Sequence, residues 1–344
     1  MASAKQFMER RDNIAAIISY IRKRTRATRA DISLALSLSW ACVSELVKLL
    51  INAGILIELT PTEPRASSEA KGRVPTLVAL NEDKYFLGVD INDSGIAISI
   101  LSMSGRIVAA KKWDEEIFET EDELAFSVCS KIDGMLLARE DCCGIGVAME
   151  GSRAKGGGWN YPLKKGYAPI SPASFIEERF GLSVFVRHDP ECMLYAIAAN
   201  GEDGAMAVRV DNGVGVAAMK DGRILDLPLE LGGVRIGEKR IVDILREGIA
   251  TGDYNEFMRV LGLGAANLAM LLGIKKVFIV GEIVNFFREY SEVFSGAFNS
   301  VSRSVEYVVS TVLEASCGAA RVAMAEYPKT TIENHYNFGS LRSL

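Results

Sequence analysis

The stretch FLGVDINDSGIAISILSMSGRIV, residues 86–108, determines the fold class of most of this 344-residue chain. Apolar residues dominate 85–90, 96–101 and 107–111, and Ser104 and Gly105 mark the turn before the last of these segments. Short apolar, β-branched runs that are bounded by turn residues predict strands joined by tight turns. The unit is typical of the start of a mixed sheet in an α/β protein.

The sequence that follows alternates between helical and strand patterns. Helices are predicted at 121–140, 174–180, 193–199, 239–251 and 253–272, and strands at 144–149, 183–187, 205–210, 215–220 and 277–280. Residues 150–169 are rich in glycine and lysine and are predicted to form a loop, and 285–315 are predicted to be largely helical. The alternation indicates an α/β body that is built as two lobes.

Residues 1–80, called the head from here on, have a different pattern. Isoleucines at a spacing of three and four predict an amphipathic helix over 8–23. Thr28 begins a second short helix, because Asp31 follows three residues later as in a capping box. The apolar residues of this second helix, Leu34 among them, are expected to be buried.

A third helix and a hairpin complete the head. Ser39 is placed to cap a helix that runs to about residue 53, and Gly54 supplies its stop. Strand-like segments at 55–59 and 74–80 follow, separated by a polar, proline-containing loop. Two helices joined by a tight turn and followed by a hairpin predict a winged helix-turn-helix.

The charge is distributed unevenly along the chain. The net charge is −5, but the head has 12 Lys and Arg against 7 Asp and Glu, which gives +5. The other 264 residues have 27 basic and 37 acidic residues, which gives −10. A basic head on an acidic body indicates that the head meets a polyanion, although the charge alone leaves a merely solvated basic face open.

The composition excludes several classes of protein. Apolar residues make up 49% and charged residues 24% of the chain, and no run of about 18 apolar residues occurs. The six cysteines are scattered without a CxxC pair, which is typical of reduced thiols rather than of a disulfide framework. Only two histidines are present, so a Cys/His zinc site is not expected. No cofactor is expected either. With no signal peptide visible, a cytoplasmic location is expected.

At this point the chain resembles the ROK family of repressors, open reading frames and sugar kinases. GRVPTLVALN (72–81) resembles the end of the wing in ROK regulators, and residues 86–108 resemble the first phosphate-binding hairpin of the actin-like ATPase fold. FIEERFGLSVFVRHDPECMLYAIA (175–198) resembles the family's segment with the catalytic base, and LPLELGGVRIGE (227–238) its Glu-x-Gly-His motif. Residues 261–284 and 318–327 resemble the late helix–strand segment and the terminal helix.

The resemblance implies an α/β architecture in which a winged helix-turn-helix precedes a two-lobed, actin-like ATPase (RNase H-like) ROK body. The implied domains are a DNA-binding head at 1–80, a first lobe at 81–190 and a second lobe at 191–344, whose C-terminal helix returns to the first lobe. A homodimer or a dimer of dimers is expected, as in the family.

The resemblance also implies an effector site. Asp189 matches the family's catalytic base, and Glu230 matches the glutamate of Glu-x-Gly-His. His188 stands where the kinases have an asparagine, which resembles the regulators, and Asn160 matches the asparagine of a glycine-rich loop. The expected ligand is a neutral polyol such as a sugar. Alternatively, Asp189 and Glu230 are relics that hydrogen bond to their own loops.

The departures from the kinases oppose phosphoryl transfer. Asn92 and Asp93 stand in the first hairpin where the kinases have glycines, and Asp211 and Asn212 stand in the second. Carboxylates at these places would repel a triphosphate, and glycine is what lets a backbone approach phosphates closely. The histidine of the zinc motif is replaced by Gly233, and no cysteine occurs between residues 192 and 317, so the family's zinc ligands are missing.

The predicted DNA contacts lie in the third helix, the second helix and the wing. Base-edge contacts are expected from the start of the third helix, phosphate contacts from its later part, and backbone or groove contacts from the rest. The expected base-edge contacts are Ser39, Trp40, Ala41 and Ser44, and the expected phosphate contact is Lys48. The expected backbone or groove contacts are Thr28, Arg29, Lys71 and Arg73. Trp40 either contacts a thymine methyl group or packs under the wing, and packing is favoured.

Three functional interpretations follow. The favoured one is a ROK-type transcriptional regulator, a repressor that binds double-stranded DNA and has lost kinase chemistry. The alternative is an active sugar kinase of the family with a DNA-binding head. In the third, the body only holds a dimer together and senses nothing.

Overall fold

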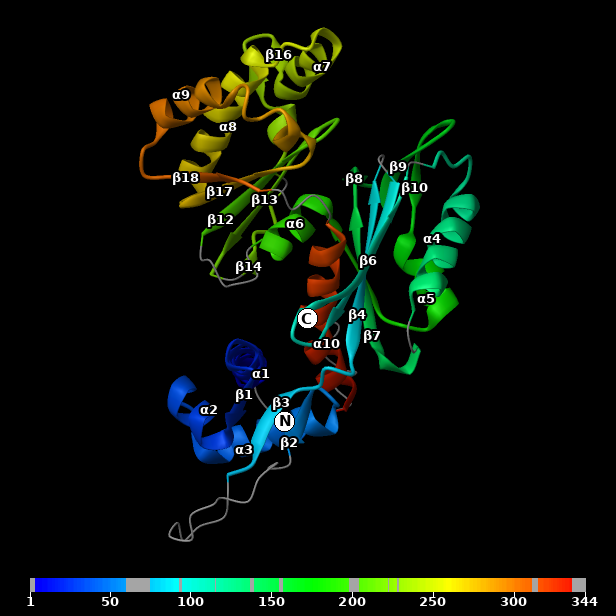
Figure 1. Cartoon of the computed structure of the whole chain (residues 1–344), viewed down its shortest axis with the longest axis vertical. Helices are drawn as coiled ribbons and strands as arrows, with labels where there is room; N and C mark the ends of the chain where they lie inside the picture. Colours follow the sequence, from blue (N-terminus) through cyan, green and yellow to red (C-terminus); the bar gives the residue numbers. More distant parts are fainter. Residues whose placement is uncertain are drawn as a thin grey trace.

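The computed structural model describes residues 4–59, 75–92, 95–114, 116–136, 139–154, 157–197, 204–221, 223–227, 229–310 and 315–335. The head lies at one end of the molecule, and two five-stranded sheets form the body (Figure 1). The long C-terminal helix α10 (Ser316–His335) lies among these three parts. The two sheets confirm the predicted two-lobed α/β body.

The head is a winged helix-turn-helix. Its elements are α1 (Ala4–Arg24), β1 (Arg26–Thr28), α2 (Arg29–Leu36), α3 (Trp40–Asn52), β2 (Leu56–Leu59) and β3 (Leu77–Leu80). The three strands form one antiparallel sheet in the order β1-β3-β2, with Leu56 opposite Leu80 and Leu59 opposite Leu77. The base of the predicted hairpin is therefore present, and most of its tip lies outside the described residues.

Side-chain caps fix the starts of α2 and α3. The Thr28 hydroxyl accepts from the Asp31 N–H, and the Thr28 N–H donates to the Asp31 carboxylate, which is the predicted capping box. The Ser39 hydroxyl accepts from the Cys42 N–H and begins α3. The expected burial of Leu34 is wrong: its side chain is 86% exposed, because it follows the buried Ile32 by two residues and so lies on the opposite face of the helix.

The first body sheet has the strand order β11-β7-β4-β5-β6. Its strands are β4 (Tyr85–Asn92), β5 (Gly95–Ser102), β6 (Ile107–Trp113), β7 (Cys142–Met149) and β11 (Val184–His188). β4, β5 and β6 form an antiparallel meander, and β7 pairs in parallel with both β4 and β11. The helices α4 (Glu121–Met135) and α5 (Pro172–Phe180) share a hydrophobic core with this sheet. A single 3-10 turn, Arg139–Asp141, precedes β7.

Residues 150–169 are not the predicted loop. They contain most of a small antiparallel sheet of β8 (Ser152–Arg153), β9 (Trp159–Leu163) and β10 (Gly166–Ile170). Trp159 and Tyr161 are 6% and 3% exposed and belong to the core of the first sheet. Burial of these two alternating aromatic residues outweighs the turn-forming composition around them.

The second body sheet has the order β14-β13-β12-β17-β18. Its strands are β12 (Ala205–Val210), β13 (Val214–Lys220), β14 (Arg223–Ile224), β17 (Lys276–Val280) and β18 (Glu306–Val309). It packs against α7 (Ile241–Thr251), α8 (Asn255–Leu272) and α9 (Ser291–Val301). The helical prediction for 285–315 missed β18, which pairs in parallel with β17 and places Tyr307 against Phe294 and Phe298.

Several short elements connect the second sheet to its helices. They are the 3-10 turns η2 (Leu231–Gly233) and η3 (Glu282–Asn285) and the two-stranded ribbon of β15 (Arg235–Ile236) and β16 (Lys239–Arg240). The helix α6 (Asp189–Ile197) begins directly after β11 and contacts β12, β13 and α10.

Helix α10 connects the body with the head. It packs on β4, β5 and β7 and against α6, and its later residues Ala323 and Met324 share a hydrophobic core with α1 and α3. In Figure 1, α10 (red) extends from beside α6 toward the head. The predicted domain boundaries at residues 80 and 190 stay predictions.

Candidate functional site

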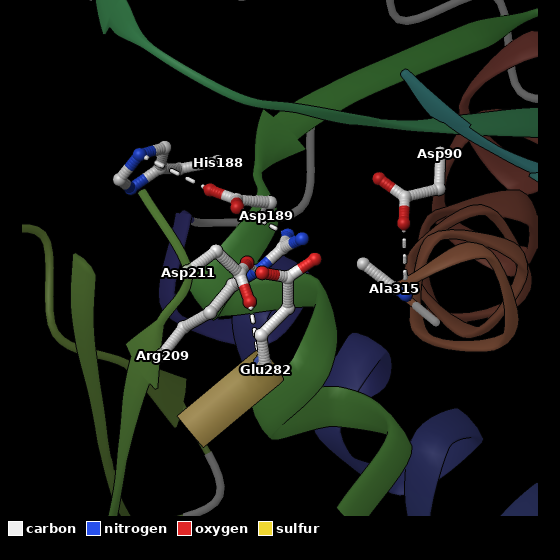
Figure 2. Close-up of polar contacts among 7 residues, drawn as sticks. All are labelled: Asp90, His188, Asp189, Arg209, Asp211, Glu282 and Ala315. Atoms are coloured by element: carbon white, nitrogen blue, oxygen red, sulfur yellow. Dashed lines mark hydrogen bonds and ion pairs between the residues drawn. The ribbon is translucent and has the colours of Figure 1, made fainter. Parts of the chain in front are cut away.

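Asp189 lies where β11 ends and α6 begins. Its side chain is 5% exposed, although an aspartate is rarely buried without a partner. The carboxylate contacts the side chains on both sides of it: His188 Nε2 lies 3.2 Å from Asp189 Oδ1, and Arg209 Nη1 donates to Oδ2 (Figure 2). The residue that matches the family's catalytic base is therefore engaged within the chain itself.

Arg209 belongs to the candidate site, although no sequence motif indicated it. It lies on β12, all six residues of which are buried, and is 7% exposed. Its Nη1 donates to Asp189, and its Nε donates to Asp211. A single arginine inside the apolar run AMAVRV was the available signal, because a buried charge requires a partner.

Asp211 is held by the backbone as well as by Arg209. The N–H of Glu282, at the start of η3, donates to Asp211 Oδ1 at 2.7 Å (Figure 2). The preceding Gly281 has a φ of +95°, and a Cβ there would overlap the Val210 carbonyl and come within 2.6 Å of Asp211 Oδ1. Glycine is therefore required for Asp211 to approach η3.

Asp90 completes the group, which we call the carboxylate–arginine cluster: Asp90, Asp189, Arg209 and Asp211. Asp90 is at the end of β4 and 1% exposed. Its Oδ2 accepts from the Ala315 N–H at 3.2 Å, directly before α10 begins (Figure 2). Its Oδ1 is buried and has no hydrogen-bond partner among the described residues.

The cluster has three carboxyl groups and one guanidinium, so full ionisation would leave a net charge of −2 in a buried place. Burial raises the pKa of Asp189 to about 7, because desolvation and the charges of Asp90 and Asp211 outweigh the attraction of Arg209. Burial also raises the pKa of Asp90. The three carboxylates hold the pKa of Arg209 above its ordinary value in spite of its burial, so the guanidinium stays charged.

The other predicted effector residues lie near His188. Its ring stacks on Trp159 of β9 with 6.1 Å between centroids, and Asn160 follows Trp159 on the same strand. Burial lowers the pKa of His188, and the charges of Glu191 and Glu230 oppose this shift. His188, Asp189 and Glu230 thus share one region, where Asp189 is buried and Glu230, at the start of η2, is exposed.

Both carboxylate oxygens of Asp189 are engaged within the chain, which bears on any role as a general base. A base must reach the proton that it removes, and both Asp189 oxygens already have partners. The expectation that Asp189 needs hydroxyl donors from a ligand therefore loses its premise, because Arg209 supplies a donor. Glu230 has no hydrogen-bond or ion-pair partner among the described residues and remains available to a hydroxyl group. Asp93 of the first hairpin lies outside the described residues.

The predicted DNA-binding residues of α3 share one exposed face. Ser39, Trp40, Ala41 and Lys48 are exposed and Ser44 is half-buried, whereas Val43, Leu46, Val47 and Leu50 form the buried face. Trp40 is 58% exposed, so the favoured packing under the wing finds no support in the described residues. Lys48 makes no ion pair with a described residue.

The other predicted DNA contacts have mixed outcomes. Thr28 is occupied by its capping box. Arg29 pairs with Glu58 of β2 at 2.7 Å, so its guanidinium is partly neutralised. Lys71 and Arg73 lie outside the described residues.

In the part of the chain that the structure describes, no group of three or more His, Cys, Asp or Glu residues is arranged to hold a metal ion. No helix there is both long and apolar enough to cross a membrane. A shallow hollow of about 850 Å³ lies between β6 and α4, lined by Trp113, Phe118 and Phe126, and is separate from the carboxylate–arginine cluster.

The two body sheets, the connection from β11 into α6 and the winged helical head together define the fold. The chain has the fold of the ROK family, an actin-like ATPase body that is preceded here by a winged helix-turn-helix, as the sequence resemblance predicted. A ROK family transcriptional regulator, a homologue of the E. coli MLC protein, matches with a TM-score of 0.72 over 93% of this chain and 98% of its own, at 16% identity.

Enzymes of the same fold match less of the chain. A ROK family glucokinase from Streptomyces griseus, in complex with glucose and AMPPNP, has a TM-score of 0.56 at 16% identity over 69% of this chain and 98% of its own. The ROK hexokinase from Thermus thermophilus has a TM-score of 0.57 at 16% identity over 72% of this chain and 99% of its own.

One curated protein is similar in sequence. The xylose repressor of Bacillus spizizenii is 22% identical over 227 residues, which are 64% of this chain. The matched part spans 58% of the length of that repressor. No family model matches the chain.

Proposed function

We propose that this protein is a transcriptional regulator of the ROK type, a repressor that binds double-stranded DNA through its head. The observation that carries the proposal is the exposed face of α3, with Trp40 and with Lys48, which makes no ion pair with a described residue, opposite a fully buried face. A recognition helix presents such a face to the major groove. The solved ROK family regulator covers 93% of this chain, whereas the solved Streptomyces griseus glucokinase covers 69%. The difference corresponds to about 83 residues, which is close to the length of the head.

Binding to duplex DNA tests the proposal. Lys48→Ala should weaken binding to every sequence and reduce the salt slope by about one, because one phosphate contact is lost. Trp40→Ala should weaken binding and alter sequence preference. Lys112→Ala, on the exposed strand β6, is the matched control and should leave both unchanged. Arg73→Ala and Lys71→Ala extend the test to the wing. Unchanged affinity and slope in Lys48→Ala would remove α3 from the interface.

We propose that the body of this protein has no kinase activity. Arg209 and His188 occupy the oxygens of Asp189, so this carboxylate is not free to take a proton from a sugar hydroxyl. A coupled assay of ATP consumption across a panel of sugars should give no sugar-dependent turnover. Turnover that disappears in Asp189→Asn would instead support the alternative, a sugar kinase with a DNA-binding head.

We further propose that a sugar effector contacts Glu230, with His188 and Asn160 nearby. Glu230 supports this because it is exposed and without a partner in the described part of the chain. Calorimetry with a panel of monosaccharides on the wild type and on Glu230→Ala tests it. Equal binding to both proteins would exclude Glu230, and no binding at millimolar concentration would favour a body that only holds the molecule together. Sedimentation would establish whether the chain is a dimer or a dimer of dimers.

A further inference from the structure

Two arginines meet where the head joins the body. Arg22 is in the last turn of α1, and Arg321 is in α10. Both reach the turn between β5 and β6: Arg22 Nη2 donates to the Met103 carbonyl at 3.3 Å, and Arg321 Nη2 donates to the Gly105 carbonyl at 3.2 Å. Three elements that are far apart in the sequence therefore converge on these two side chains.

Neither of the two guanidinium groups pairs with a carboxylate in the described part of the chain. The other acceptor of Arg22 is the Met324 sulfur, at 3.1 Å, which is also neutral. The Nε of Arg22 and the Nε of Arg321 are both buried without a hydrogen-bond partner among the described residues. Buried polar groups of this kind indicate a water or an ion that satisfies them.

The charges around the junction do not balance. Glu82, the acid whose charge acts on Arg22, accepts from the Ser104 N–H and hydroxyl, each at 3.1 Å, and Arg106 lies 3.9 Å from it. Three arginines against one glutamate leave a net charge of +2. Burial lowers the pKa of Arg22, and the charge of Arg321 lowers it further, while Glu82 partly opposes this. Two like charges in a poorly solvated place favour a counterion over a neutral water.

We propose that this junction binds a phosphate group between Arg22 and Arg321, in contact with the β5–β6 turn. A phosphate carries close to two negative charges at neutral pH, which matches the net +2, and the Nε–H of each guanidinium fork, which has no partner among the described residues, can donate to one of its oxygens. Because the phosphate would touch both α1 and α10, it would fix the head on the body. Only this regulatory consequence rests on the proposed function; the binding itself does not.

The test is the thermal stability of the full chain in inorganic phosphate against chloride at equal ionic strength. Phosphate should raise Tm saturably by about 2–4 °C, because a ligand that binds only the native state stabilises it. Arg22→Gln and Arg321→Gln should each abolish this rise. In chloride, Arg22→Gln should be at least as stable as the wild type, since it removes one of two repelling charges.

Three controls separate the junction from other phosphate sites. Arg259→Gln removes an exposed arginine that pairs with Glu256 on α8 and should keep the full response. Lys48→Ala should also keep it, which excludes the DNA-binding face as the site. Arg321→Lys keeps the charge but loses the fork, and should give a weaker response even if a glutamine variant fails to fold.

Glucose 6-phosphate against glucose identifies the source of the phosphate group. A response to the ester alone, lost in Arg321→Gln, would mean that the group belongs to a larger metabolite, in agreement with the proposal. Absence of any saturable response to phosphate or to the ester would overturn it and assign a water to the junction. An unchanged response in both Arg22→Gln and Arg321→Gln would overturn it as well. Because no DNA enters the assay, neither result depends on the proposed function.

Discussion

At the scale of single residues, Arg209 determines the character of the candidate site. Replacing it with alanine would leave the buried Asp189 and the half-buried Asp211 without their cation. Removing one partner of a buried ion pair costs about 3–5 kcal/mol of the free energy of unfolding. We therefore expect a loss of this size for Arg209→Ala in urea denaturation.

A triple variant tests whether the unpaired carboxylates cause the loss of stability. Arg209→Met combined with Asp189→Asn and Asp211→Asn removes the cation and two anions together. This triple variant should recover much of the stability that Arg209→Met alone loses, since neutral groups do not need a counter-charge. A single Arg209→Ala variant as stable as the wild type would contradict the assigned role of Arg209.

The raised pKa of Asp189 makes stability depend on pH. The pKa is about 7 in the folded chain and about 4 in the unfolded chain, so the folded state binds more protons between these values. The stability contributed by protonated Asp189 is complete below about pH 4 and is lost as pH rises through 7. Asp189→Asn should flatten the pH dependence of the free energy of unfolding in this window, and Asp243→Asn, at a half-buried position on α7, should not. The same slope in Asp189→Asn and in the wild type would contradict the expectation.

At the scale of elements, three glycines allow α10 to pack closely. A Cβ at Gly88 would overlap the Ser316 carbonyl, one at Gly146 the Ala319 carbonyl, and one at Gly318 the Cys192 carbonyl. These overlaps are with backbone atoms, so a side chain could be accommodated only by moving α10 away from β4, β7 or α6. The small residues of GAARVAMAEY thus allow α10 to pack against neighbouring elements on several of its sides.

Gly318→Ala should therefore destabilise the protein although alanine is the better helix former. Overpacking of this kind costs about 1–3 kcal/mol or more, against about 1 kcal/mol gained from helix propensity. Gly134→Ala is the matched control, because Gly134 lies in α4 and a Cβ there meets nothing within 4 Å. It should stabilise the protein slightly in the same denaturation assay. Equal effects of the two substitutions would refute close packing at Gly318.

Local signals explain which elements the sequence could predict. The caps at Thr28 and Ser39 and the apolar runs of β4, β5, β12 and β17 are encoded within a few residues, and their elements appear where expected. By contrast, Trp159 of β9 and Tyr307 of β18 pack into hydrophobic cores that residues far away in the sequence form. No local sequence pattern indicates this packing, so the two strands were not predicted. Asp189 and Glu230 could be located by family resemblance.

The partners of these site residues could not be predicted in the same way. Arg209 is 20 residues from Asp189 in the sequence and reaches it only because β12 lies beside α6. The Ala315 N–H is 225 residues from Asp90. Tertiary pairing of this kind determines whether a carboxylate is free or engaged, so the sequence indicated an available effector ligand where the structure has an ion pair.

At the scale of the whole molecule, α10 connects the carboxylate–arginine cluster to the head. Its N-terminal end is next to the Ala315–Asp90 hydrogen bond, and its Ser316 hydroxyl is 2.8 Å from that of Ser99. Its later residues Ala323 and Met324 share a core with α1 and α3. The described residues of the head therefore share their hydrophobic core with α10, and a displacement of α10 would act on α1. A packed element of this kind, which both sites contact, can carry energetic coupling between them.

Asp90→Asn tests whether α10 transmits such a displacement. It keeps an acceptor for the Ala315 N–H, removes one buried charge and leaves every residue of the head unchanged. Substitutions along a coupling element change affinities by about 0.5–2 kcal/mol, so the Kd for duplex DNA should change about 2- to 30-fold at fixed salt. Fluorescence anisotropy measures it, with Asp243→Asn as the control of equal charge that should bind as the wild type does. An Asp90→Asn variant that is folded and has the wild-type Kd would show that the cluster and the head act independently, and α10 would then be only a shared support.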